Sequence, residues 1–179
     1  MEERTDQELV LACRNGEHGA FAELVDRYQL KIFNAALRVT GDNADAQDVT
    51  QATFLKVFEK LDSFNPDFRF FSWIYKIAVN EALNVVGRRR STALSESGVF
   101  EPSADPEREA QGREVGRAIE SALMELRPPQ RLTIVLRHFH GLSYQEMSEI
   151  IEVPVKTVKS RLFSARRELR AKLDQSGLH

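Results

Sequence analysis

The chain has 179 residues, of which 42% are hydrophobic and 29% charged, and its formal net charge at pH 7 is −2. This length suits one ordinary domain or two small ones, and each small one would have a thin core that a partner would help to order. The sequence contains no run of about 18 apolar residues, so no membrane-spanning helix is predicted. The acidic start, Met1–Asp6, predicts no secretory signal, and the single cysteine, Cys13, suits a reducing cytoplasm.

The charges are segregated along the chain. Between Val153 and Leu173, seven Lys and Arg residues accompany one acidic residue, Glu168, and a second basic run is Arg88–Arg90. Acidic residues collect between positions 41 and 67 and again between 91 and 112. Such segregation favours separate surfaces for separate partners, nucleic acid among them, and solvated helix ends are the alternative interpretation.

Helical periodicity dominates the first part of the chain, and neither an alternating strand pattern nor a fixed-period repeat occurs. The capping box Thr5-x-x-Glu8 predicts the start of the first helix, and Gly41 predicts the end of the second. A third helix is expected over about Ala44–Leu61 and a fourth over about Phe70–Arg88. Pro66 disfavours helix in the loop between them.

Residues 91–112 are polar, acidic and rich in Ser and Pro, which predicts a flexible linker. It divides the chain into a domain of residues 1–90 and a domain of residues 113–179. The expected fold class is therefore all-α, with two small helical domains.

The second domain is predicted to contain four helices. Two longer ones are expected over about Arg113–Leu126 and Gln130–Phe139. A short helix then begins at the capping box Ser143-x-x-Glu146, and a last helix covers about Val155–Leu173. A short helix, a tight turn and a second helix together form a helix-turn-helix.

The last helix has two contrasting faces. At 100° per residue, apolar side chains form one stripe from Val155 to Leu169, and hydroxyl groups and cations lie opposite and beside it. Such a face can reach base edges in the major groove, and flanking cations can bind phosphates. The alternative is a solvated amphipathic helix, but the capped helix and turn before it favour DNA. The predicted duplex-reading residues are Lys156, Thr157, Lys159, Ser160, Arg161, Ser164, Arg166 and Arg167.

The fourth helix suggests a second kind of nucleic-acid site. Trp73 shares a face with amides and a cation, a combination that suits single-stranded nucleic acid, because aromatic rings stack on bases. The preceding loop could line a pocket for an extruded base, and the basic run could hold phosphates. The alternative is that Trp73 packs under the neighbouring loop. The candidate residues are Phe64, Asn65, Trp73, Lys76, Asn80, Asn84, Arg88, Arg89 and Arg90.

The third helix has apolar residues on two faces. One face runs from Ala46 to Thr53, and another from Phe54 to Leu61. The second face could be a groove for a protein partner, and a helix sandwiched within its own domain is an equally good interpretation.

Four stretches, in this order and spacing, resemble the extracytoplasmic-function (group 4) sigma factors of the sigma-70 family. In the first domain they are Asp45–Phe58 (DAQDVTQATFLKVF) and Phe71–Asn80 (FSWIYKIAVN). In the second domain they are Gly141–Met147 (GLSYQEM) and Val153–Arg166 (VPVKTVKSRLFSAR). Small departures occur at Ala52 and Lys76, where many members of the family have Glu and Arg.

The resemblance implies two helical domains, usually called sigma-2 and sigma-4, in a protein with no catalytic chemistry. It implies that the third helix docks on the β′ clamp helices of core RNA polymerase. The loop and fourth helix would read and help to melt the −10 promoter element, the last helix would read the −35 element as duplex, and the second domain would grip the β flap. An anti-sigma factor would occlude the polymerase-binding surfaces. The polymerase-binding candidates are Asp45, Asp48, Gln51, Phe54, Val57 and Phe58.

Two other function classes compete with this interpretation. A free-standing helix-turn-helix regulator would bind duplex DNA as a dimer and would not need polymerase. An enzyme is disfavoured, because neither a phosphate-binding glycine loop nor a nucleophile–base pair nor a metal-ligand cluster is visible. We expect His138-Phe-His140 to be ordinary helix surface, and we expect neither a metal nor a cofactor.

Overall fold

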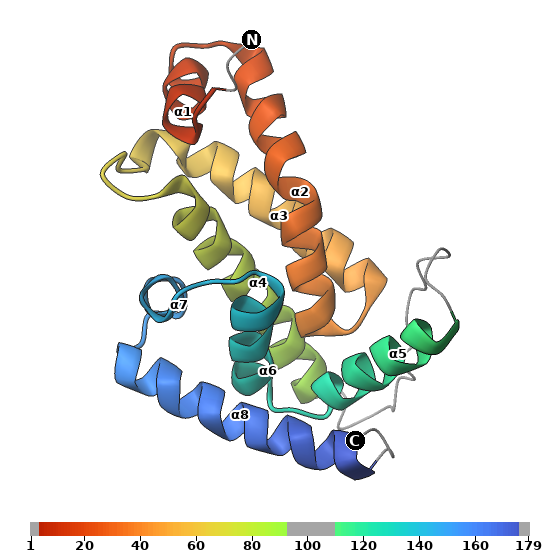
Figure 1. The fold of residues 1–179 in the computed structure, drawn as a ribbon. Helices are drawn as coiled ribbons and strands as arrows, with labels where there is room; N and C mark the ends of the chain where they lie inside the picture. The colour runs from red at the N-terminus through yellow and green to blue at the C-terminus, as the bar shows by residue number, and fades with distance from the viewer. Residues whose placement is uncertain (1–3, 93–109, 176–179) are drawn as a thin grey trace.

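The computed structural model describes residues 4–92 and 110–175, and every regular element in these ranges is helical (Figure 1). The predicted caps set the helix ends of the first half. Thr5 accepts a hydrogen bond from the Glu8 amide and the Glu8 carboxylate accepts one from the Thr5 amide, while Gly41 ends the second helix with a left-handed φ of 74°. The helices are α1 (Asp6–Arg14), α2 (His18–Thr40), α3 (Asn43–Lys60) and α4 (Phe70–Thr92).

The second half begins with α5 (Ala110–Met124) and continues with α6 (Pro128–Ile134). The predicted helix over 130–139 is only partly regular, because at Val135–Phe139 it widens into a π-helical turn. Such turns are rare and are often found at functional positions.

The helix-turn-helix follows this turn. The predicted capping box opens α7 (Tyr144–Ile151), with both of its hydrogen bonds between Ser143 and Glu146 present. The last helix is α8 (Val155–Gln175). None of the helices in the described ranges has the length and apolar character needed to cross a bilayer.

Regular helix enters both ends of the predicted linker, since α4 continues to Thr92 and α5 begins at Ala110. The rest of the predicted linker, residues 93–109, lies outside the described residues. The two predicted halves are therefore recognisable as α1–α4 and α5–α8.

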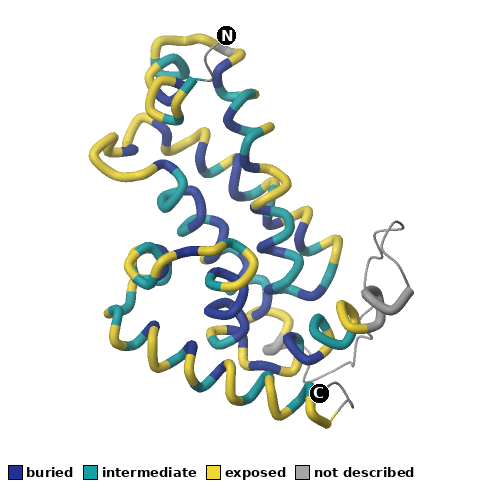
Figure 2. The backbone as a smooth tube through the Cα atoms, viewed as in Figure 1, coloured by how far each residue is buried: buried dark blue, intermediate teal, exposed yellow. Residues whose placement is uncertain are grey.

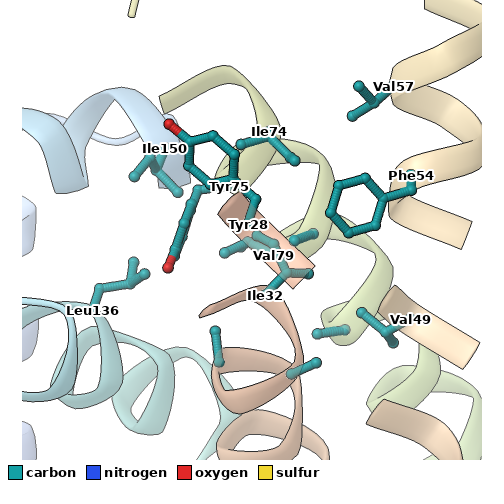
Figure 3. Close-up of a cluster of buried hydrophobic side chains, with 14 of the residues drawn as sticks. Tyr28, Ile32, Val49, Phe54, Val57, Ile74, Tyr75, Val79, Leu136 and Ile150 are labelled. Carbon is teal, nitrogen blue, oxygen red and sulfur yellow. The ribbon is translucent and has the colours of Figure 1, made fainter. Parts of the chain in front are cut away.

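The two halves share one apolar core. Helix α4 packs against α7, and α2 packs against α5, α6 and the π-helical turn. Figure 3 shows Leu136 and Ile150 of the second half beside Tyr28 and Tyr75 of the first, and Figure 2 shows buried stretches of both halves next to each other in this zone. Burying a side chain such as Leu136 stabilises a fold by about 1.5–3 kcal/mol. The apolar core of each half is thus covered in part by apolar side chains of the other half.

A smaller apolar cluster holds the second half together. It joins α5, α6 and α8 and includes Leu123, Ile134 and Leu162, each at most 2% exposed. Helix α8 is therefore anchored along one side only, and its other side remains at the surface.

Candidate nucleic-acid and partner surfaces

The turn between α7 and α8 is fixed by local backbone chemistry. Glu152 takes a left-handed φ of 52°, and the Ser148 hydroxyl donates to the Val153 carbonyl at 2.6 Å. Behind the turn, the predicted apolar stripe of α8 is buried at Val158 and Leu162. This arrangement confirms the predicted helix-turn-helix and directs the opposite face of α8 away from the protein.

The outward face of α8 carries most of the predicted duplex-reading residues. Thr157, Arg161 and Ser164 are half-buried at the edges of this face, whereas the other predicted residues are exposed. Arg166 donates from Nε to Nε2 of the exposed His138 at 3.1 Å. The exposed residues are Lys156, Lys159, Ser160, Arg166 and Arg167.

The sequence interpretation missed an aromatic residue on this face. Phe163 is 68% exposed, although large aromatic side chains are usually well covered in folded proteins. At 100° per residue it lies between Lys156 and Lys159 when viewed along the helix axis, and the same count would have found it from the sequence.

The loop after α3 differs from its prediction. Phe64 does not line a pocket, because it is only 3% exposed and its ring packs against Phe70 and Trp73, with centroids 5.6 and 5.0 Å away. Trp73 is half-buried in this cluster, so the alternative that it packs under the loop is confirmed in part. The exposed residues of the loop include Asn65, which was predicted, and the aromatic Phe68, which was not.

Along α4, the predicted single-strand readers fall into two groups. Asn80, Asn84 and Arg88 are exposed. Lys76 is half-buried and forms an ion pair with Glu152, in the turn before α8, at 2.7 Å. The first group therefore forms the accessible part of this candidate surface.

The remaining residues of the basic run have different surroundings. Arg89 pairs with Asp42 at 3.1 Å and with Asp45 at 2.8 Å, at the N-terminal end of α3. Burial raises the pKa of Asp45, while Arg89 opposes that shift. Arg90 was also predicted to contact DNA, but its side chain is not among those that the structure describes.

Helix α3 is partly sandwiched and partly exposed. Phe54 and Val57 are buried in the core of the first half, so the prediction that they contact a partner directly is corrected for these two side chains. Four of the exposed residues lie three or four positions apart, which places them in one stripe along the helix. They are Asp48, Gln51, Leu55 and Phe58.

The stripe on α3 is unusually apolar for a surface. Leu55 is 60% exposed and Phe58 is 64% exposed, with the Phe58 ring edge-on to Phe21 at a centroid distance of 5.2 Å. Apolar side chains repeated at this spacing are what a second helix needs in order to pack alongside. Leu55 was missed in the sequence, although its spacing from Gln51 and Phe58 would have indicated it.

Polar contacts also tie the two halves together. Arg69 and Lys76 on the first half pair with Glu146 and Glu152 of the helix-turn-helix. Deeper inside, the hydroxyl of Tyr75 lies 2.9 Å from Nδ1 of His140. These contacts join both candidate nucleic-acid surfaces in one closed arrangement.

His140 corrects the expectation that the His138–His140 segment is helix surface. Burial, followed by the nearby charges of Arg38 and Lys31, lowers the pKa of His140 from 6.5 to about 4, and burial raises the pKa of Tyr75. The imidazole is therefore neutral near pH 7, and the Tyr75 hydroxyl can donate to it. His138 and Phe139 are exposed as predicted.

Comparison with known proteins gives matches over both halves. The model of the family Sigma-70 region 2 matches residues 24–92, and that of Sigma-70, region 4 matches residues 116–169. The RNA polymerase sigma-H factor of Pseudomonas aeruginosa is 35% identical, with 90% of each chain covered. The ECF RNA polymerase sigma-E factor of Escherichia coli K12 is 36% identical, with 92% of each chain covered.

Two solved structures resemble the fold. CnrH in complex with the cytosolic domain of CnrY matches with a TM-score of 0.73 and 29% identity, covering 95% of this chain and 97% of that one. The sigma factor RpoE in complex with the anti-sigma factor NepR from Bartonella quintana matches with a TM-score of 0.71 and 26% identity, covering 86% and 96%. Each match therefore extends over both halves of the chain.

Proposed function

The chain belongs to the extracytoplasmic-function (ECF) sigma factors of the sigma-70 family, and from that premise we propose how its surfaces divide promoter recognition. As such a factor it is not an enzyme, and it directs promoter-specific transcription by RNA polymerase. The division assigns duplex DNA to α8, melted DNA to the loop and α4, and polymerase to α3. Because this work is done with polymerase, we place the protein in the cytoplasm.

Helix α8 reads the −35 element in the major groove. The observation that carries this assignment is its outward face, where Lys156, Ser160 and Arg167 surround the exposed Phe163. Hydroxyl and cationic groups bind base edges, and an aromatic ring can contact a thymine methyl group. Lys159 and Arg166 flank this face and are suited to phosphates, which position a helix without reading sequence.

The loop and α4 recognise the −10 element as single strand. Asn80 and Asn84 offer amides to base edges, and Arg88 can bind the backbone. Phe68 replaces Phe64 as the exposed loop aromatic on which a base can stack. Extruding a base costs a few kcal/mol, and stacking returns about 1–3 kcal/mol, so the two nearly cancel. The isolated factor should therefore not hold DNA open without polymerase.

The stripe on α3 binds core polymerase. Leu55 and Phe58 supply the apolar contact, and Asp48 and Gln51 supply polar contacts on the same side. A helical partner fits this geometry, which supports docking on the β′ clamp helices. The second half would grip the β flap, so that polymerase holds both DNA readers and raises the effective concentration of each.

The closed arrangement is incompatible with reading both elements at once. The −35 and −10 elements lie about 25 base pairs apart, or about 85 Å at 3.4 Å per pair. A compact chain of this length has a radius of gyration of only about 16 Å. The halves must therefore separate on polymerase, and an anti-sigma factor could hold them closed. The similarity to CnrH and RpoE, both described in complexes with a second protein, supports this regulation.

Run-off transcription with purified core enzyme tests the proposal. We expect a promoter-specific product only when this chain and core are both present, and its loss when either element is scrambled. A protein that footprints duplex DNA alone as a dimer, and that adds nothing to core, would instead match a free-standing helix-turn-helix regulator.

A further inference from the structure

Arg14, at the end of α1, forms hydrogen bonds with the loop that follows α3. Its guanidinium donates to the carbonyl oxygen of Leu61 from Nη2 at 2.8 Å and from Nε at 3.2 Å. Nη2 also lies 3.0 Å from the Asp62 carbonyl and 2.5 Å from the Phe64 carbonyl. One side chain therefore fixes three backbone carbonyls in a short segment.

A guanidinium is well suited to this place. At the end of the 3-10 turn Leu61–Ser63 the Leu61 carbonyl accepts the Phe64 amide, and its second lone pair is available to a further donor. Carbonyls that follow the end of a helical segment need donors from outside it. A cation near such an end also interacts favourably with the helix dipole. The planar fork of Arg14 presents several N–H donors in fixed directions, which a lysine ammonium does not.

The loop has a second anchor on its opposite side. The Phe64 ring is buried against Phe70 and Trp73 of α4. Beyond that ring, the Asn65 side chain accepts from the Asp67 amide at 2.9 Å. The exposed part of the loop thus projects from a segment that α1 and α4 hold from two sides.

Helix α1 is itself held independently of Arg14. Leu9 and Val10 are buried in the core, and Asp6 accepts hydrogen bonds from Arg27 and Tyr28 of α2. Losing the Arg14 contacts would therefore release the carbonyls of Leu61, Asp62 and Phe64 while leaving α1 docked, with Gln7 of α1 still donating to the Pro66 carbonyl at 3.2 Å. This separation allows the role of Arg14 to be tested apart from folding.

We propose that Arg14 is a positioning residue for −10 recognition. By fixing the carbonyls of Leu61, Asp62 and Phe64, it presets the loop so that Asn65 and Phe68 meet the extruded base without first being ordered. Preorganisation of this kind improves binding because less conformational freedom is lost on contact. The inference rests on the proposed function of the loop, and it gives α1 a part in promoter recognition.

The only tryptophan of the chain reports on this loop directly, because the Trp73 ring lies 5.0 Å from Phe64. Arg14→Gln should shift the Trp73 emission and increase its quenching by acrylamide, and Arg14→Lys should restore part of the signal. Thr5→Ala is the matched control, since it removes the α1 cap and leaves the Arg14 side chain in place. Circular dichroism checks that each variant folds. If Arg14→Gln does not fold, the same measurements are made on Arg14→Lys.

Discrimination at the −10 element is then measured with holoenzyme and fork-junction DNA, comparing the cognate non-template strand with one substituted in the −10 element. Arg14→Gln should reduce discrimination by about tenfold, the effect of having to order roughly two side chains on binding. Affinity for core and for −35 duplex should not change. Unaltered Trp73 fluorescence, or unaltered discrimination in the variant, would overturn the role of Arg14. Absence of discrimination in the unmodified holoenzyme would instead overturn the function proposed for the loop.

Discussion

Tyr75 and His140 meet across the contact between the two halves, with the phenol oxygen 2.9 Å from Nδ1 of the imidazole. Tyr75 belongs to α4, which also carries the proposed −10 reader, and His140 follows the π-helical turn of the second half. The two rings are also edge-on, with centroids 5.3 Å apart. The contact between the two halves therefore includes a titratable group, the His140 imidazole.

Acid should weaken the closed arrangement. Burial, with Arg38 and Lys31 nearby, lowers the pKa of His140 to about 4, whereas the exposed imidazole titrates near 6.5. The unfolded or opened chain thus binds more protons between these values, and stability falls as the pH drops from 6.5 toward 4. Thermal unfolding between pH 7 and pH 5 should show this slope, and His140→Gln should flatten it. The same slope in His140→Gln as in the unmodified chain would assign it to other groups.

Apolar contacts should hold the halves together more strongly than the surface ion pairs. Ile150 is buried in the shared core, and truncating such a side chain costs about 2–5 kcal/mol. The Lys76–Glu152 pair is largely exposed, and such pairs contribute about 0.2–1 kcal/mol. Small-angle scattering should therefore detect a larger radius of gyration for Ile150→Ala and little change for Glu152→Gln. The reverse order would mean that charge pairing controls closure.

Features that depend on neighbours in the sequence were predicted well. The caps at Thr5 and Ser143 and the stop at Gly41 are where the sequence places them, because each is a local backbone requirement. The buried stripe of α8 follows equally from helical periodicity. Leu55 and Phe163 were omitted, although the same periodicity would have included them.

Features that depend on tertiary contacts were predicted less well. Phe64 and Phe68 are both aromatic residues of one loop, and only the packing of Phe64 on Trp73 decides which of them is buried. In the same way, Phe54 is covered by helices of its own half. The placement of His140 against Tyr75 depends on the contact between the halves, which no local pattern encodes. The π-helical turn was not predicted either.

Leu55→Ala should weaken binding to core polymerase. Leu55 lies in the exposed stripe of α3 and is 60% exposed, so its loss should not destabilise the fold. Truncating a central apolar contact of an interface costs about 1–2 kcal/mol, or roughly 5- to 30-fold in dissociation constant. Titration of labelled protein with core measures the change. Leu30→Ala on α2 is the control, because Leu30 is similarly exposed but lies outside the stripe. Equal losses in both variants would remove the stripe from the interface.

Phe163→Ala should separate base reading from phosphate binding on α8. An exposed aromatic ring that contacts a thymine methyl contributes to discrimination but carries no charge. The substitution should therefore lower affinity for the cognate −35 duplex by about 1 kcal/mol while leaving the salt dependence of binding unchanged. Lys159→Ala should do the opposite, because loss of one phosphate contact reduces the salt slope by about one and weakens all sequences alike. Binding isotherms over a range of salt concentrations, on cognate and scrambled duplexes, measure both effects. If Phe163→Ala weakened cognate and scrambled DNA equally, the outward face of α8 would bind the backbone without reading bases.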